Sequence, residues 1–201
     1  VIWVLNDTED FLNDSSYSIN IADYDGTAIS GACALKSGIE HLLMAKIGIY
    51  GAQPVVAYVC DLDGDYYTVD DHILIIIDMQ GNILYESAQA QISDIEFVDQ
   101  NGQKVIAYSE NGNIKILNNY VPQLLIEGNI PVGGDFVFIS GDMEYIVFEV
   151  PNSGMNSEKD LYAYTFDQVS GKWNNAVALT NQTAQITMYD AIESASGIQL
   201  V

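Results

Sequence analysis

The densest group of potential metal ligands in the sequence is the run Asp61-Leu62-Asp63-Gly64-Asp65, in which carboxylates occupy every second position. A turn at Gly64 would bring three of these side chains onto one hard cation, and calcium prefers carboxylate oxygens as ligands. Carboxylates held close together repel each other, so a bound ion would also remove an electrostatic cost. The pattern therefore predicts a calcium site with ligands from Asp61, Asp63, Asp65 and Asp70.

The spacing of this loop departs from two known kinds of calcium loop. An EF-hand loop beginning at Asp61 would have glycine at its sixth position and glutamate at its twelfth, but the sequence has Tyr66 and His72 there. A propeller-type loop would carry an aspartate at its ninth position, which is Val69, whereas the acid follows one residue later. The alternative is a solvated acidic loop whose aspartates cap their own turns.

The same loop holds the side chains best placed to contact a ligand, namely Tyr66, Tyr67 and Asp71. Residues 6–16 form a second long loop and carry four more carboxylates. Long loops on a rigid scaffold are common sites of function. If both loops join equivalent strands of a repeat, they emerge on one face, which we expect to be strongly negative.

The composition excludes some classes of partner. Aspartate and glutamate number 28 against six lysines, arginine is missing, and the formal charge is −22. Phosphate binding needs clustered cations, so we expect no nucleic-acid partner. The longest apolar runs, such as 73–77, fall far short of the ~20 residues of a membrane-spanning helix, so we expect no insertion into a membrane.

Cysteine and histidine are too few for a zinc site. The two cysteines, Cys33 and Cys60, either form one bridge or are two buried, inert thiols, and free cysteine is usually a small core residue. The two histidines, His41 and His72, each fall at the edge of an expected strand without the spacing of a metal pair. We interpret both as hydrogen-bonded structural residues.

An apolar strand recurs along the chain, at residues 1–4, 55–58, 105–108, 145–148 and 198–201. The starts lie 54, 50, 40 and 53 residues apart, which is typical of β-propeller blades with loops of variable length. Runs rich in β-branched and aromatic residues, bounded by Gly, Asn and Asp, predict an all-β protein.

Each recurrent strand has neighbours that complete a four-stranded antiparallel unit. Strands are predicted before it at 42–50, 92–98, 135–140 and 184–190. Third strands are predicted at 17–23, 72–78, 113–117 and 161–166, and fourth strands at 28–35, 83–87, 123–127 and 173–179. The turns before the fourth strands are expected at 25–26, 80–81, 118–119 and 170–171, and three of them contain the glycine that hairpins favour.

The sequence thus predicts one β-propeller domain over residues 1–201, with blade boundaries near 38, 90, 133 and 182. Three complete blades would be flanked by two partial ones. Because the first and last segments both occupy the second-strand position, we expect an arc of a larger propeller, within a larger multi-domain chain.

Two stretches carry a resemblance to a known group of proteins. Residues 57–65 (AYVCDLDGD) with 68–74 (TVDDHIL), and residues 170–180 (SGKWNNAVALT), resemble blades of bacterial extracellular proteins with TolB-like or WD40-like propeller domains. The resemblance implies the propeller fold and a secreted or cell-surface setting in bacteria. It supplies no catalytic residues.

We therefore expect a non-catalytic module that binds a protein or carbohydrate ligand or serves as a scaffold, with calcium as the one expected cofactor. One alternative is a glycan-active propeller, whose carboxylate pair could not be singled out among 28 acids. Its sialidase form is disfavoured without arginine, and both tryptophans, Trp3 and Trp173, are expected to pack within blades. The other alternative is a propeller accessory to a peptidase, although no Gly-x-Ser-x-Gly motif occurs.

Overall fold

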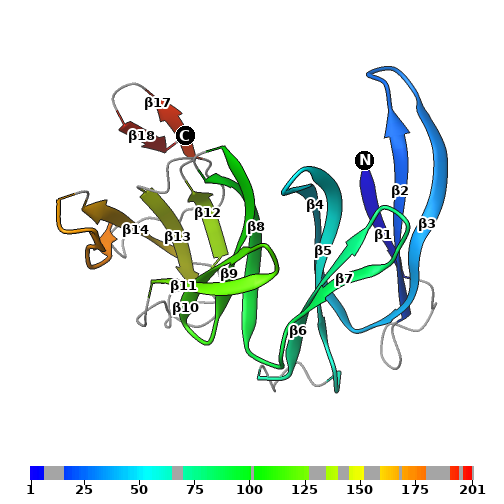
Figure 1. Ribbon diagram of the computed structural model, residues 1–201, viewed down its shortest axis with the longest axis horizontal. Coiled ribbons are helices and arrows are strands. Elements are labelled where there is room, and N and C mark those ends of the chain that lie inside the picture. Colours follow the sequence, from blue (N-terminus) through cyan, green and yellow to red (C-terminus); the bar gives the residue numbers. More distant parts are fainter. Residues whose placement is uncertain are drawn as a thin grey trace. The chain divides into compact units, whose positions relative to one another are not determined.

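The computed structural model describes residues 1–6, 16–64, 70–100, 102–126, 135–139, 145–151, 159–167, 169–179, 191–194 and 197–200. Every helix or strand in these residues is a β-strand (Figure 1). A helix long and apolar enough to cross a membrane is not found in this part of the chain. The chain divides into two compact units, Val1–Ile92 and Ser93–Val201.

In the first unit, the residues that the structure describes form two antiparallel sheets. One has the order β1-β2-β3, and the other has the order β4-β5-β6-β7. Their strands are β1 (Ile2–Asn6), β2 (Ser16–Tyr24), β3 (Ile29–Glu40), β4 (Leu42–Tyr50), β5 (Gln53–Asp61), β6 (His72–Asp78) and β7 (Ile83–Glu86).

The described residues of the second unit form three antiparallel sheets. The strands of its first sheet are β8 (Ile92–Gln100, beginning at the unit boundary), β9 (Gln103–Glu110), β10 (Asn113–Asn118) and β11 (Val121–Ile126). The second sheet is formed by β12 (Asp135–Ile139), β13 (Tyr145–Pro151), β14 (Lys159–Asp167), β15 (Lys172–Trp173) and β16 (Val177–Ala178). The third is the pair β17 (Ala191–Ser194) and β18 (Gly197–Leu200).

The predicted all-β repeat is confirmed. The recurrent apolar strand forms β1, β5, β9, β13 and β18, and in each complete sheet it is the second strand in sequence and in space. Three complete sheets are flanked by one of three strands and one of two. The strand predicted at 184–190 lies outside the described residues, and β18 pairs with β17.

Two predicted details are wrong. The strand expected at 173–179 is split, because three residues, 174–176, lie opposite two on β14, and one extra residue interrupts the ladder as a bulge. The turn expected at 118–119 lies one residue later, since Asn118 pairs with Val121. Its central residues Asn119 and Tyr120 have φ of 48° and 61°, as a tight two-residue hairpin of this twist requires.

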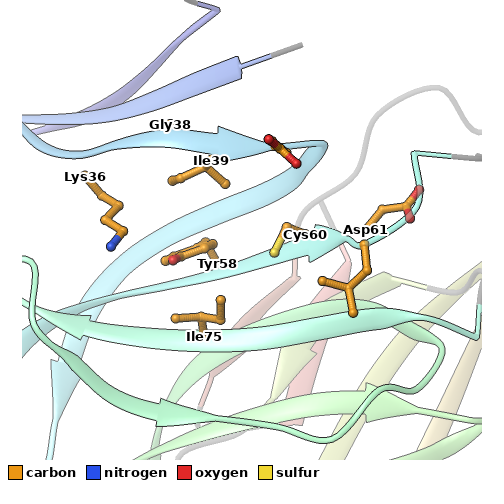
Figure 2. Close-up of a pocket in the computed structure, with 9 residues that line it drawn as sticks. Lys36, Gly38, Ile39, Tyr58, Cys60, Asp61 and Ile75 are labelled. Atoms are coloured by element: carbon orange, nitrogen blue, oxygen red, sulfur yellow. The ribbon is translucent and has the colours of Figure 1, made fainter. Parts of the chain in front are cut away.

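The strand β5 is the best buried element of the first unit. Every residue from Val55 to Asp61 is buried, so the strand lacks the alternation of a half-exposed sheet. Val56, Tyr58 and Cys60 share one face and pack with residues of the first sheet, including Ile39. Figure 2 shows Tyr58 and Cys60 between Ile39 on β3 and Ile75 on β6.

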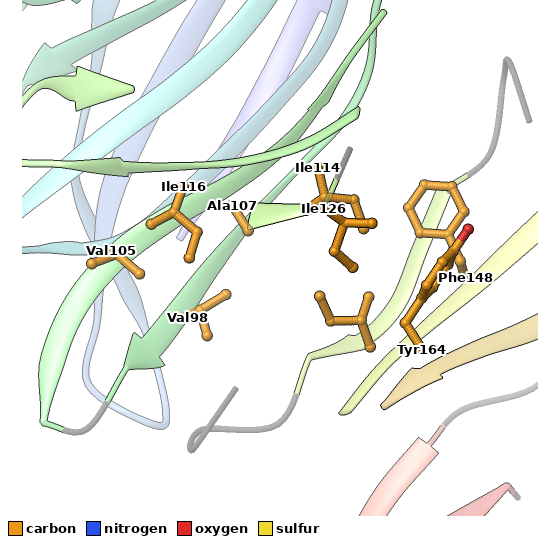
Figure 3. Close-up of a cluster of buried hydrophobic side chains, with 9 residues drawn as sticks. Val98, Val105, Ala107, Ile114, Ile116, Ile126, Phe148 and Tyr164 are labelled. Atoms are coloured by element: carbon orange, nitrogen blue, oxygen red, sulfur yellow. The ribbon is translucent and has the colours of Figure 1, made fainter. Parts of the chain in front are cut away.

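The second unit has a comparable core between two of its sheets (Figure 3). Apolar side chains from β8 to β11 meet Ile146, Phe148 and Tyr164 from β13 and β14. Trp173 packs against this cluster and contacts Phe166 edge to face, with ring centroids 5.5 Å apart. Trp173 therefore packs within its sheet, as the sequence predicted.

A pair of identical substitutions tests the packing of the first unit. Ile77 is fully buried in the core of β5 and β6, whereas Ile83 on β7 is 51% exposed. Ile77→Ala should lower the free energy of unfolding in urea by about 2–5 kcal/mol, because it removes buried methyl groups and leaves a cavity. The control Ile83→Ala should change it by about 0.5 kcal/mol or less. Equal effects would contradict the burial described here.

Candidate metal centre

The site is built where the buried strand β5 ends. Asp61 is its last residue and only 2% exposed. Its Oδ1 accepts hydrogen bonds from the backbone N–H groups of Asp63, at 3.1 Å, and Gly64, at 3.2 Å. These bonds turn the chain back immediately after the strand. The other oxygen, Oδ2, is buried and has no hydrogen-bond partner.

Two further aspartates approach this buried carboxylate. Asp63 is exposed, and its backbone N–H also donates to Oδ2 of Asp71, at 3.2 Å. Asp71 directly precedes β6, and its Oδ1 is buried without a hydrogen-bond partner. One carboxylate oxygen from each of Asp61, Asp63 and Asp71 lies within 4.8 Å of the other two. We call these three residues the aspartate cluster.

The register of the sheet explains why the two ends of the loop between β5 and β6 lie close together. Asp61 pairs with His72 across β5 and β6, so residue 71 lies next to the start of the loop. The loop between the strands, residues 62–71, therefore begins and ends at the cluster. The described part of this loop is 62–64 and 70–71.

The electrostatics of the cluster disfavour three bare carboxylates. Loss of solvent, followed by the charges of Asp61 and Asp63, raises the pKa of the Asp71 carboxyl above its ordinary 3.8. A divalent cation among these side chains would reverse this effect, because its charge favours the ionised carboxylates. Two oxygens bound to one calcium ion lie no more than about 5 Å apart, which is twice the Ca–O distance of 2.3–2.6 Å, and each pair of these three oxygens meets that limit.

His41 supports the start of the loop. It is the single residue between β3 and β4, and its φ is 48°, in the left-handed region that few residues other than glycine adopt. Its carbonyl oxygen accepts a hydrogen bond from the backbone N–H of Asp61, at 3.1 Å. Its ring lies over Gly64, where an added Cβ would overlap the imidazole of His41. Nothing in the local sequence signals this contact.

His72 has the structural role that the sequence predicted. It is 9% exposed, and its Nδ1–H donates to the carbonyl oxygen of Ile92, at 2.9 Å. Its backbone carbonyl accepts from the N–H of Ala90, at 3.0 Å. His72 thus holds the segment after β7 against β6.

The structure brings together only part of the predicted ligand set. Asp61 and Asp63 lie in the cluster, and Asp71, predicted as a ligand contact, is its third member. Asp70 is exposed and is not in this group. Asp65, Tyr66 and Tyr67 lie outside the described residues.

A cavity of about 220 Å³ lies beside the cluster, between β3 of the first sheet and β5 and β6 of the second (Figure 2). Its lining includes Ile39, Glu40, Cys60, Asp61 and Leu62. Burial, with smaller contributions from Glu86 and Asp61, raises the pKa of the Cys60 thiol to about 11. Figure 2 shows the Asp61 carboxylate pointing away from this space.

The two cysteines differ in exposure and are both free. Cys60 is buried, as predicted for an inert thiol, but the same prediction for Cys33 is wrong, because Cys33 is exposed on β3. The register places Cys33 opposite Ile21 of β2, on a strand whose N-terminal half is exposed.

No protein-family model and no curated protein matches the sequence. Among solved structures, the chain is similar to the crystal structure of TolB from Acinetobacter baumannii, with a TM-score of 0.50 and 17% sequence identity. The similarity covers 92% of this chain and 42% of that TolB chain, so this chain spans less than half its length. At this identity the likeness shows the fold alone, which is that of a β-propeller. Two of the complete sheets are four-stranded antiparallel blades, the third is such a blade with its fourth strand split into β15 and β16, and the other two sheets are partial blades.

The difference between the two thiols is open to a direct test. Iodoacetamide at pH 8 should alkylate Cys33 rapidly and Cys60 slowly, because Cys60 is buried and only a small fraction of it is thiolate far below pH 11. Peptide mass spectrometry over time gives the two rates, and Cys33→Ser should remove only the fast one. Equal rates in the folded protein would contradict the described environment of Cys60.

Proposed function

We propose that this chain is a non-catalytic β-propeller module for binding a protein or carbohydrate ligand or for scaffolding, stabilised by one calcium ion. The cluster of Asp61, Asp63 and Asp71 is the proposed calcium site. The observation that carries this proposal is the buried Oδ2 of Asp61, which has no hydrogen-bond partner and whose carboxylate faces two others.

The physical argument concerns the cost of burying a carboxylate. An ionised oxygen removed from water is strongly destabilising unless it is paired or binds a metal. Nearby carboxylates increase that cost by electrostatic repulsion. Ionised carboxylates also cannot hydrogen-bond to each other, because each of them only accepts hydrogen bonds. A hard divalent cation would reduce both the cost of burying the Asp61 carboxylate and the repulsion between the three carboxylates. Calcium is favoured over magnesium because it accepts irregular sets of oxygen ligands at 2.3–2.6 Å.

The proposed setting is the surface or exterior of a bacterial cell. Calcium sites of extracellular modules have dissociation constants of about 10⁻⁴–10⁻³ M, and a site assembled from three carboxylates at a loop fits that range. The net charge of −22 also suits a calcium-rich exterior, where cations screen self-repulsion. The resemblance of residues 57–65 and 170–180 to blades of bacterial extracellular proteins supports the same setting.

Calcium should raise the melting temperature of this chain, because an ion that binds only the folded state stabilises it by mass action. In 1 mM calcium, about one to ten times a dissociation constant of 10⁻⁴–10⁻³ M, the gain is about 0.4–1.4 kcal/mol, or about 1–6 °C for a chain of this length. The measurement is a thermal melt by circular dichroism in millimolar calcium and in chelator.

Two substitutions in the same loop provide a matched pair. Asp63→Asn should remove most of the calcium-dependent shift, and in chelator it should melt at or above the wild-type temperature because one repelling charge is gone. Asp70→Asn removes an exposed aspartate outside the cluster and should keep the wild-type shift. A wild-type chain without a shift in millimolar calcium, or an equal loss in both variants, would contradict the calcium site.

The non-catalytic part of the proposal has its own test. Incubation of the calcium-loaded chain with a panel of polysaccharides should release no reducing sugar, whereas a glycan or protein array should show retention without turnover. Measurable hydrolysis of any polysaccharide would favour a glycan-active propeller and would overturn this part of the proposal.

A further inference from the structure

We infer that calcium at the aspartate cluster controls access to the cavity between the first two sheets, with His41 as the mechanical link. This inference rests on the calcium site proposed above and assigns a regulatory consequence to it. The ion-bound chain keeps the cavity closed around Cys60, and removal of the ion opens it.

The link begins at the backbone of the cluster. The N–H of Asp61 donates to the carbonyl oxygen of His41, and Oδ1 of Asp61 holds the N–H of Gly64. The imidazole of His41 lies directly over Gly64, close enough that even a methyl group there would overlap it. The first turn of the ion loop and the β3–β4 connection are therefore held together at two points, one a hydrogen bond and the other a packing contact.

The same two segments form one end of the cavity. Ile39 and Glu40, just before His41, line it from β3, while Cys60, Asp61 and Leu62 line it from the end of β5. A movement that separates residues 61–64 from His41 must therefore move the cavity wall. Since His41 alone connects β3 to β4, the connection has little length with which to absorb that movement.

The negative charge of the aspartate cluster drives the proposed opening when no cation is bound. Without a cation, the carboxylates of Asp61, Asp63 and Asp71 repel each other at separations below 4.8 Å, which favours spreading of the turn at Gly64. With a cation, the same side chains are drawn together. The φ of 48° at His41 is a conformation that requires support from its surroundings, because His41 is not glycine. Ion binding provides that support.

Cys60 reports on this opening in a Cys33→Ser chain, where it is the only thiol. Calcium binding is measured separately by isothermal titration calorimetry with calcium chloride. We expect calcium to slow iodoacetamide modification of Cys60 in the folded chain by about fivefold or more relative to chelator. Asp63→Asn should abolish this effect, and Asp70→Asn should keep it.

A second reporter separates local opening from unfolding of the whole chain. Ala107 is fully buried on β9 in the second unit, so Ala107→Cys in a chain with Cys33→Ser and Cys60→Ser reports on opening elsewhere. Calcium should protect this thiol less than it protects Cys60. Equal protection would show a general stabilisation and would overturn the inference.

His41→Gly tests the link itself. Glycine adopts a positive φ without strain and keeps the carbonyl oxygen, but it removes the ring that covers Gly64. This variant should still bind calcium in the calorimeter and should lose most of the protection of Cys60. If the Cys33→Ser chain with His41 intact binds calcium but Cys60 is not protected, the inference is refuted, whereas the proposed calcium site is not. Absence of binding heat and of protection would refute the calcium site as well.

Discussion

The burial of β5 on both faces is the constraint on which the rest of the first unit depends. Apolar side chains from Val55 to Val59 fix this strand against its neighbours, and the burial continues to its last residue, Asp61. An ionisable group at the end of such a strand cannot turn freely to water. Its carboxylate is held by two backbone N–H groups on one oxygen and is left with a buried, unpartnered oxygen on the other. The burial of β5 is therefore the reason that we propose a calcium ion at Asp61.

The proposed regulation by calcium depends on the position at which this strand ends. The cluster lies at the junction where the three-stranded first sheet passes into the four-stranded second sheet through His41. A bound ion at this point would act on both sheets, because the loop is attached to the connection by a hydrogen bond and by the packing of an imidazole on Gly64. An ion on a remote loop would stabilise that loop alone. If the proposed site binds calcium, a propeller built from similar blades responds to the ion at a single junction between two of them.

The sequence predicted the repeat well because its signals are local. Apolar runs and turn residues define β4 and β6 to the residue. Properties that depend on register or on distant segments were predicted less well. Of the neighbouring aspartates 70 and 71, only Asp71 belongs to the cluster. The pairing of Asp61 with His72 places residue 71 there. The contact of His41 with Gly64 and the exposure of Cys33 likewise depend on how sheets pack, which no local pattern encodes.

The most direct test of the central claim is a crystal structure of this chain grown in calcium. The account predicts one ion with oxygen ligands from Asp61, Asp63 and Asp71 at distances of about 2.3–2.6 Å, and an anomalous signal at that position. A structure in millimolar calcium that shows these three carboxylates apart from one another, or linked only by water, would contradict it.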